Sequence, residues 1–99
     1  MSDKSSNPVA IITGGSRGVG AATAKLLASK GWNITITCTS SIEDADAVVK
    51  ECEALGVEAI ALSADVSDDN ACRKTSEETF KKWGRIDALV NNAGTTKFV

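Results

Sequence analysis

The sequence predicts an α/β fold in which strands of a parallel sheet alternate with helices. Short runs rich in β-branched residues alternate with longer runs of helical spacing, in the order β-α-β-α-β-α-β. Glycines follow the helical runs, and the connections between runs are short. Parallel strands need crossover connections, which are right-handed and here helical. We therefore expect the first half of a doubly wound parallel sheet, with its strands in the order 3-2-1-4.

The first three elements follow from local patterns. The run 9–13 is short and apolar and is followed by glycines, as expected for a buried parallel strand. Alanines and leucines at helical spacing over 19–30 predict a helix, and Gly31 is a natural terminator for it. The β-branched run 33–37 predicts the second strand.

The remaining elements have signals at their ends. A helix over 41–55 opens on serine with aspartate three residues later, which is the spacing of a capping box, and it stops at a glycine. The run 57–63 predicts the third strand. Two acids after Ser67 favour the positive end of a third helix, which Gly84 closes. The run 86–91 predicts the fourth strand.

The composition predicts one folded unit at 9–99 behind a flexible tail at 1–8. Of the 99 residues, 42% are hydrophobic and 24% are charged, which excludes a disordered chain. The net charge of −2 gives no general attraction to nucleic acid, and no apolar run reaches the ~18 residues of a membrane span. The tail resembles no signal or transit peptide, so a cytoplasmic protein is expected. Three widely spaced cysteines without histidine argue against disulfides and against a metal site.

A glycine-rich loop, TGGSRGVG at 13–20, joins the first strand to the first helix. Gly14 allows a sharp turn, Gly18 allows backbone to approach a phosphate, and Gly20 permits close packing of helix on strand. The helix start offers free N–H groups and a positive dipole to a pyrophosphate. A loop of this kind between a strand and a helix predicts nucleotide binding.

Two features favour NADP(H) over NAD(H). Arg17 lies at the start of a helix, where a cation is unfavourable unless an anion binds there, so it is a candidate ligand for a 2′-phosphate. Cofactors without that phosphate are usually held by an acid at the end of the second strand. Cys38 occupies this position and hydroxyl residues follow it, while the nearest acid, Glu43, falls inside the next helix.

Three motifs in order resemble the short-chain dehydrogenase/reductase family, over 9–94. They are the glycine loop, the pair Asp65–Val66 after the third strand, and the segment WGRIDALVNNAG at 83–94. The resemblance implies a Rossmann-type fold and an NADP(H)-dependent oxidoreductase that moves hydride between nicotinamide and a substrate carbonyl or hydroxyl. Within the family, the 3-oxoacyl-carrier-protein reductases are the most similar group.

The resemblance also implies roles for individual residues. Gly14, Ser16, Arg17, Gly18 and Val19 would hold the phosphates. The other implied contacts are Thr39 and Ser40 at the adenosine ribose, Asp65 and Val66 at the adenine, and Asn92, Ala93 and Gly94 along the adenosine-ribose side.

The chain contains no tyrosine, whereas the family uses a serine, a tyrosine and a lysine downstream of the NNAG motif for proton transfer. No catalytic residue is therefore assigned. The 99-residue chain is expected to be inactive alone, as the amino-terminal part of a domain cut before its catalytic segment, and the parent protein is expected to be a homo-oligomer. Two alternatives remain open: a non-catalytic nucleotide-binding module that ends at residue 99, and a different nucleotide user such as a methyltransferase.

Overall fold

The structure, a computed structural model, describes residues 6–14, 18–39, 42–64 and 68–91. They show the predicted alternation of strands and helices. None of the helices in this part of the chain combines the length and the apolar composition that a bilayer span requires. The elements are β1 (Val9–Thr13), α1 (Gly18–Ser29), β2 (Asn33–Cys38), α2 (Ile42–Ala54), β3 (Ala59–Ser63), α3 (Asp69–Trp83) and β4 (Ala88–Asn91).

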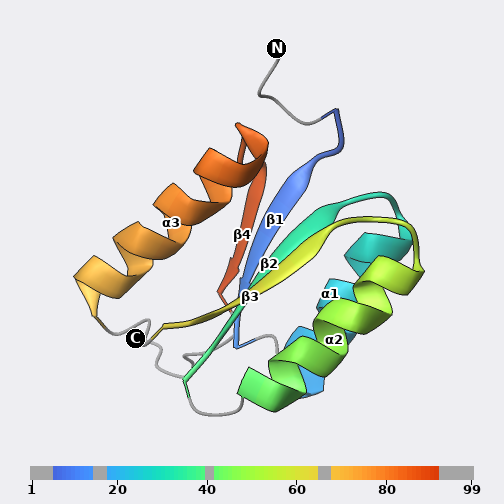
Figure 1. Ribbon diagram of the computed structural model, residues 1–99, viewed down its shortest axis with the longest axis horizontal. Helices are drawn as coiled ribbons and strands as arrows, with labels where there is room; N and C mark the ends of the chain where they lie inside the picture. Colours follow the sequence, from blue (N-terminus) through green and yellow to red (C-terminus); the bar gives the residue numbers. More distant parts are fainter. Residues whose placement is uncertain (1–5, 15–17, 40–41, 65–67, 92–99) are drawn as a thin grey trace.

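The four strands form one parallel sheet in the order β3-β2-β1-β4, which confirms the predicted topology. β1 pairs with β2 on one side and with β4 on the other, and it is buried along its whole length. Figure 1 shows α1 and α2 together on one face of the sheet and α3 on the other. Helices on both faces of a parallel sheet are the Rossmann-type, doubly wound arrangement that the sequence predicts.

Two strands begin later than predicted. β3 begins at Ala59 rather than at 57, and the amide of the preceding residue, Glu58, donates to Oδ1 of Asn33 at 3.0 Å. β4 begins at Ala88 rather than at 86, and the residue before it, Asp87, binds the start of β1 through its carboxylate. In both cases the side-chain contact accompanies a backbone hydrogen bond to the neighbouring strand: the carbonyl oxygen of Glu58 accepts from the amide of Ile34, and the amide of Asp87 donates to the carbonyl oxygen of Val9.

The hydrophobic core lies between the sheet and the layer of α1 and α2. Ile12, Ile34 and Ile36 are fully buried there. α1 faces them with small side chains, among them Ala24 and Ala28, which are also fully or almost fully buried. Because interaxial distances depend on side-chain size at the contact, these alanines allow the helix to pack close to the strands.

Polar groups join α3 to the opposite face of the sheet. The hydroxyl of Thr79 lies 2.9 Å from that of Thr35 in β2 and 2.8 Å from the carbonyl oxygen of Thr75. The side chains of Thr35 and Thr79 are both fully buried, so these contacts satisfy groups that are costly to bury alone. Farther along α3, Nε1 of Trp83 donates to Oε1 of Glu58 at 2.6 Å.

Both ends of α3 are capped. Oδ1 of Asp68 accepts from the amide of Asn70 at 2.9 Å, as in a typical N-cap. Gly84 adopts φ 76° and donates its amide to the carbonyl oxygen of Phe80, which confirms the predicted glycine terminator. Only glycine adopts this left-handed conformation without strain.

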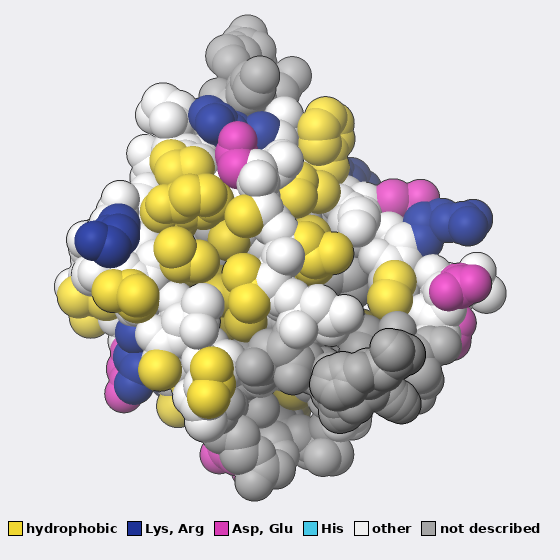
Figure 2. All heavy atoms as spheres, turned by 180° about the vertical axis from the view of Figure 1, so that it is seen from behind, with side chains coloured by type: hydrophobic (Ala, Val, Ile, Leu, Met, Phe, Trp, Pro, Cys, Tyr) yellow, Lys and Arg dark blue, Asp and Glu magenta, His cyan; other side chains and the backbone are white. Residues whose placement is uncertain are grey.

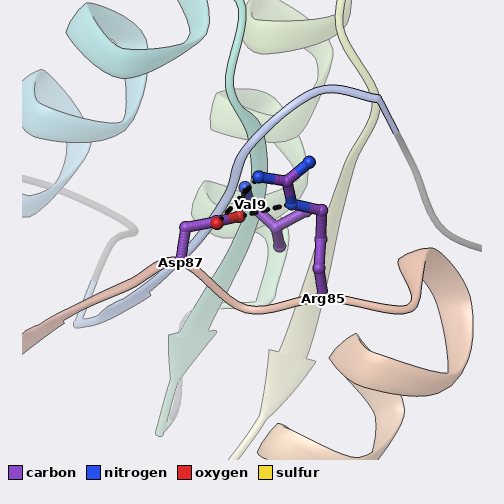
Figure 3. Close-up of polar contacts among 3 residues, drawn as sticks. All are labelled: Val9, Arg85 and Asp87. Atoms are coloured by element: carbon purple, nitrogen blue, oxygen red, sulfur yellow. Dashed lines mark hydrogen bonds and ion pairs between the residues drawn. The ribbon is translucent and has the colours of Figure 1, made fainter.

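A carboxylate ties the start of β4 to the start of β1 (Figure 3). Oδ2 of Asp87 accepts from the amide of Val9 at 2.8 Å, and the amide of Asp87 donates to the carbonyl oxygen of Val9 at 2.8 Å. Arg85 donates to both carboxylate oxygens, from Nε at 2.8 Å and from Nη2 at 2.9 Å. This hydrogen bonding raises the pKa of the Arg85 guanidinium above its ordinary value. We call these three residues the Asp87 clamp.

Large apolar side chains remain exposed near β4, which is an edge strand within the described sheet. Leu89 in β4 is 65% exposed and Phe80 on α3 is 57% exposed. Figure 2 shows hydrophobic side chains gathered on the face opposite that of Figure 1. An exposed apolar edge of this kind favours association with another protein surface.

Candidate functional site

The candidate site lies where the parallel strands end. Because the strands are parallel, their carboxyl ends meet at one edge of the sheet, and the connections to the helices start there (Figure 1). Ligands of open α/β sheets bind at this edge. The last residues of the four strands are Thr13, Cys38, Ser63 and Asn91.

Both described ends of the glycine loop have left-handed backbone. Gly14 follows β1 with φ 67°, and Gly18 opens α1 with φ 63°. A side chain on Gly18 would meet nothing within 4 Å, so this position needs glycine for its backbone conformation and is open to a close approach. Gly20 is buried within α1, in keeping with its predicted place against the sheet.

The start of α1 suits an anion. A helix start presents N–H groups without partners inside the helix and a positive dipole. The first turn of α1 carries no acidic residue, and Val19, which lies in it, is 72% exposed. A phosphate at this helix start would therefore meet N–H donors and no opposing carboxylate from that turn.

Side-chain contacts on both sides hold the end of β1. The hydroxyl of Thr13 lies 3.1 Å from Oδ1 of Asn91 and 3.4 Å from the carbonyl oxygen of Val90, both in β4. On the other side, the amide of Gly14 donates to the hydroxyl of Thr37 in β2 at 3.2 Å. Gly14 is thus fixed to β2, and Thr13 before it is fixed to β4.

The end of β2 carries no carboxylate. Cys38 is 4% exposed and packs in the core beside α1 and α2, while Thr39 after it is exposed. Glu43 lies inside α2, as predicted. The described residues here offer a ribose a hydroxyl group and no nearby acid from the strand itself.

Four of the residues predicted to bind the cofactor lie at this edge: Gly14, Gly18, Val19 and Thr39. Thr37 was not among the predicted site residues, because a threonine in a β-branched strand is expected without any special role. The others fall outside the described residues: Ser16, Arg17, Ser40, Asp65, Val66, Asn92, Ala93 and Gly94.

The chain also resembles known proteins along nearly its whole length. The model of the short chain dehydrogenase family matches residues 8–99. A 3-oxoacyl-(acyl-carrier-protein) reductase of Staphylococcus epidermidis is 41% identical over 91 residues, which are 92% of this chain and 37% of that protein. One from Synechocystis is 46% identical over 89 residues, 90% of this chain and 36% of that protein.

Solved structures of short-chain dehydrogenases are also similar to this chain. A short chain dehydrogenase from Burkholderia cenocepacia in complex with NADP superposes with a TM-score of 0.86 at 45% identity, over 97% of this chain and 39% of that one. A short-chain dehydrogenase/reductase from Serratia marcescens gives 0.85 at 36% identity, over 95% and 38%. The chain thus spans less than half the length of these relatives. By its sheet order, its glycine loop and its match to the family model, the chain belongs to the short-chain dehydrogenase family.

Proposed function

We propose that this chain is the cofactor-binding part of an NADP(H)-dependent oxidoreductase. The observation that carries the proposal is the pair of left-handed glycines, Gly14 and Gly18, that bracket the loop between β1 and α1 at the ligand-binding edge of the sheet. This loop leads into a helix start without an acidic residue. Such a site binds the pyrophosphate of a dinucleotide.

Individual residues of the site have the following proposed roles. Backbone groups of Gly14, Gly18 and Val19, with Ser16 and Arg17, bind phosphates. The adenosine half is bound by a second group that follows β2, β3 and β4: Thr39 and Ser40 at the ribose, Asp65 and Val66 at the adenine, and Asn92, Ala93 and Gly94 beside the adenosine ribose.

The preference for NADP(H) rests on charge. A 2′-phosphate needs a cation and tolerates no neighbouring carboxylate. Arg17 supplies the cation in this proposal, and β2 ends in Cys38 rather than in an acid. The related Burkholderia cenocepacia structure contains NADP, which supports the proposal.

The proposed reaction is hydride transfer between the nicotinamide and a carbonyl or hydroxyl carbon of a small-molecule substrate. The bound nicotinamide supplies or accepts the hydride, and the residues of this chain hold and orient the adenosine-phosphate half. The names of the related reductases favour a 3-oxoacyl compound as the substrate. Proton transfer is assigned to residues outside this chain, and a cytoplasmic homo-oligomer is the expected form of the parent protein.

The test is a calorimetric titration of the full-length protein with NADPH and with NADH. We expect tighter binding of NADPH. Arg17→Glu should weaken NADPH binding by at least about tenfold, because one charge-assisted contact to a phosphate contributes ~1.5–3 kcal/mol. Arg73→Glu is the matched control, since Arg73 is an exposed residue of α3 and makes the same change in net charge.

Equal affinity for the two cofactors would contradict the NADP(H) preference but leave a dinucleotide site. Binding of neither cofactor would contradict the whole proposal and would favour a protein that uses this fold without nicotinamide chemistry. An equal effect of Arg17→Glu and Arg73→Glu would show that net charge, rather than a contact at the loop, controls the affinity.

A further inference from the structure

β1 and β2 stop pairing just before the glycine loop departs. Their backbone ladder ends at the pair Ile12 and Ile36, whereas the ladder between β1 and β4 continues to Thr13. β2 itself runs on to Cys38 and stays paired with β3. The end of β1 therefore leaves β2 at this point.

A side chain bridges the two strands where the ladder has ended. The hydroxyl of Thr37 accepts the amide proton of Gly14 at 3.2 Å. Thr37 is 1% exposed, so its hydroxyl is enclosed by protein and is not offered to a ligand. Because Gly14 has φ 67°, small rotations there redirect the residues that follow, and an anchor on its amide limits such rotations.

We propose that Thr37 is a positioning residue for the nucleotide: its buried hydroxyl holds Gly14 in the conformation from which the loop reaches the phosphates. This inference rests on the proposed function, since it assigns a role within the same site. Thr37 acts through Gly14 and does not touch the cofactor. Holding a binding loop in its bound conformation before the ligand arrives raises affinity by lowering the entropy lost on binding.

Thr35 provides a matched control. It lies on the same strand two residues earlier, so its side chain points to the same face of the sheet as that of Thr37. It is also fully buried, and its hydroxyl contacts Thr79 of α3 rather than the loop. Replacing either threonine by valine keeps the shape of the side chain and removes one buried hydroxyl. Only the change at Thr37 removes an acceptor from Gly14.

The experiment compares Thr37→Val, Thr37→Ser and Thr35→Val in the full-length protein. Titration calorimetry gives the Kd for NADPH, and amide hydrogen exchange of the cofactor-free protein gives the protection of Gly14. We expect Thr37→Val to raise Kd by about three- to tenfold, the effect of losing one hydrogen bond, and to speed exchange at Gly14. Thr37→Ser keeps the hydroxyl and should restore both values, while Thr35→Val should change neither.

Each other result overturns the inference. Unchanged Kd and unchanged Gly14 exchange in Thr37→Val would show that the hydroxyl only fills space. Equal effects of Thr37→Val and Thr35→Val would trace the lost affinity to general destabilisation. If the unsubstituted protein binds no NADPH, the proposed function fails and the role for the nucleotide fails with it. Gly14 exchange then still reports separately whether Thr37 fixes the loop.

Discussion

Removing the carboxylate of the Asp87 clamp should destabilise the protein through a buried backbone amide. Val9 is fully buried, and Oδ2 of Asp87 accepts its N–H at 2.8 Å. In Asp87→Ala this donor loses its acceptor, and an unsatisfied buried donor costs ~1–3 kcal/mol. The backbone bond from the amide of Asp87 to the carbonyl oxygen of Val9 remains possible, so the strands should stay in register.

Urea unfolding of the full-length protein, followed by circular dichroism, measures the loss. With a slope of about 2 kcal/mol/M, a loss of ~2 kcal/mol lowers the midpoint by about 1 M. Arg85→Ala is the control: it removes the arginine and keeps the bond between Val9 and Asp87, so we expect a smaller shift. If Arg85→Ala destabilises as much as Asp87→Ala, the stability comes from the ion pair and the reasoning about Val9 is refuted.

Three further predictions concern buried groups. Trp83→Phe removes the donor to Glu58 and should lower the free energy of unfolding by ~1–2 kcal/mol in urea titrations, whereas an unchanged value would show that the contact contributes nothing. In a double-mutant cycle of Thr79→Val and Thr35→Val, the double variant should lose less stability than the sum of the single variants, because each single change leaves one buried hydroxyl with fewer partners. Burial is the larger cause that raises the pKa of the Cys52 thiol, and the negative charge of the neighbouring Glu51 is the next. The folded state then holds this proton at pH values where the unfolded thiol has lost it. The contribution of the Cys52 thiol to the free energy of unfolding is therefore complete below about pH 8.5 and is lost as pH rises through the folded pKa. The fall in stability between pH 8 and 10 should be shallower in Cys52→Ala, and identical slopes would contradict this.

The order of elements could be predicted from the sequence because it depends on local signals. Glycines such as Gly31 and Gly84 end helices through their own backbone conformation, φ 92° and φ 76°, and need no distant partner. Where short β-branched runs alternate with helical runs, each helix connects two strands by a crossover, which predicts a parallel sheet. These signals lie within a few residues of the feature that they predict.

The side-chain contacts just before β3 and β4 could not be predicted, because they join residues that are far apart in the sequence. The amide of Glu58 is bound by Asn33, and the carboxylate of Asp87 binds Val9, 78 positions away in the sequence. Thr37 was missed for the same reason. Its partner Gly14 is 23 positions away, and only the fold brings the two strands together.

The glycine loop has a glycine with left-handed backbone at each of its described ends, Gly14 and Gly18. Glycine at both ends permits left-handed turns, but it also removes the side chains that would restrict them. The restriction comes instead from the strand before the loop. β1 is held at its start by the Asp87 clamp and at its end by Thr13 and Thr37, with ladders on both sides between them. A strand fixed at both ends gives Gly14 one defined position, so the sheet sets where this end of the candidate site lies.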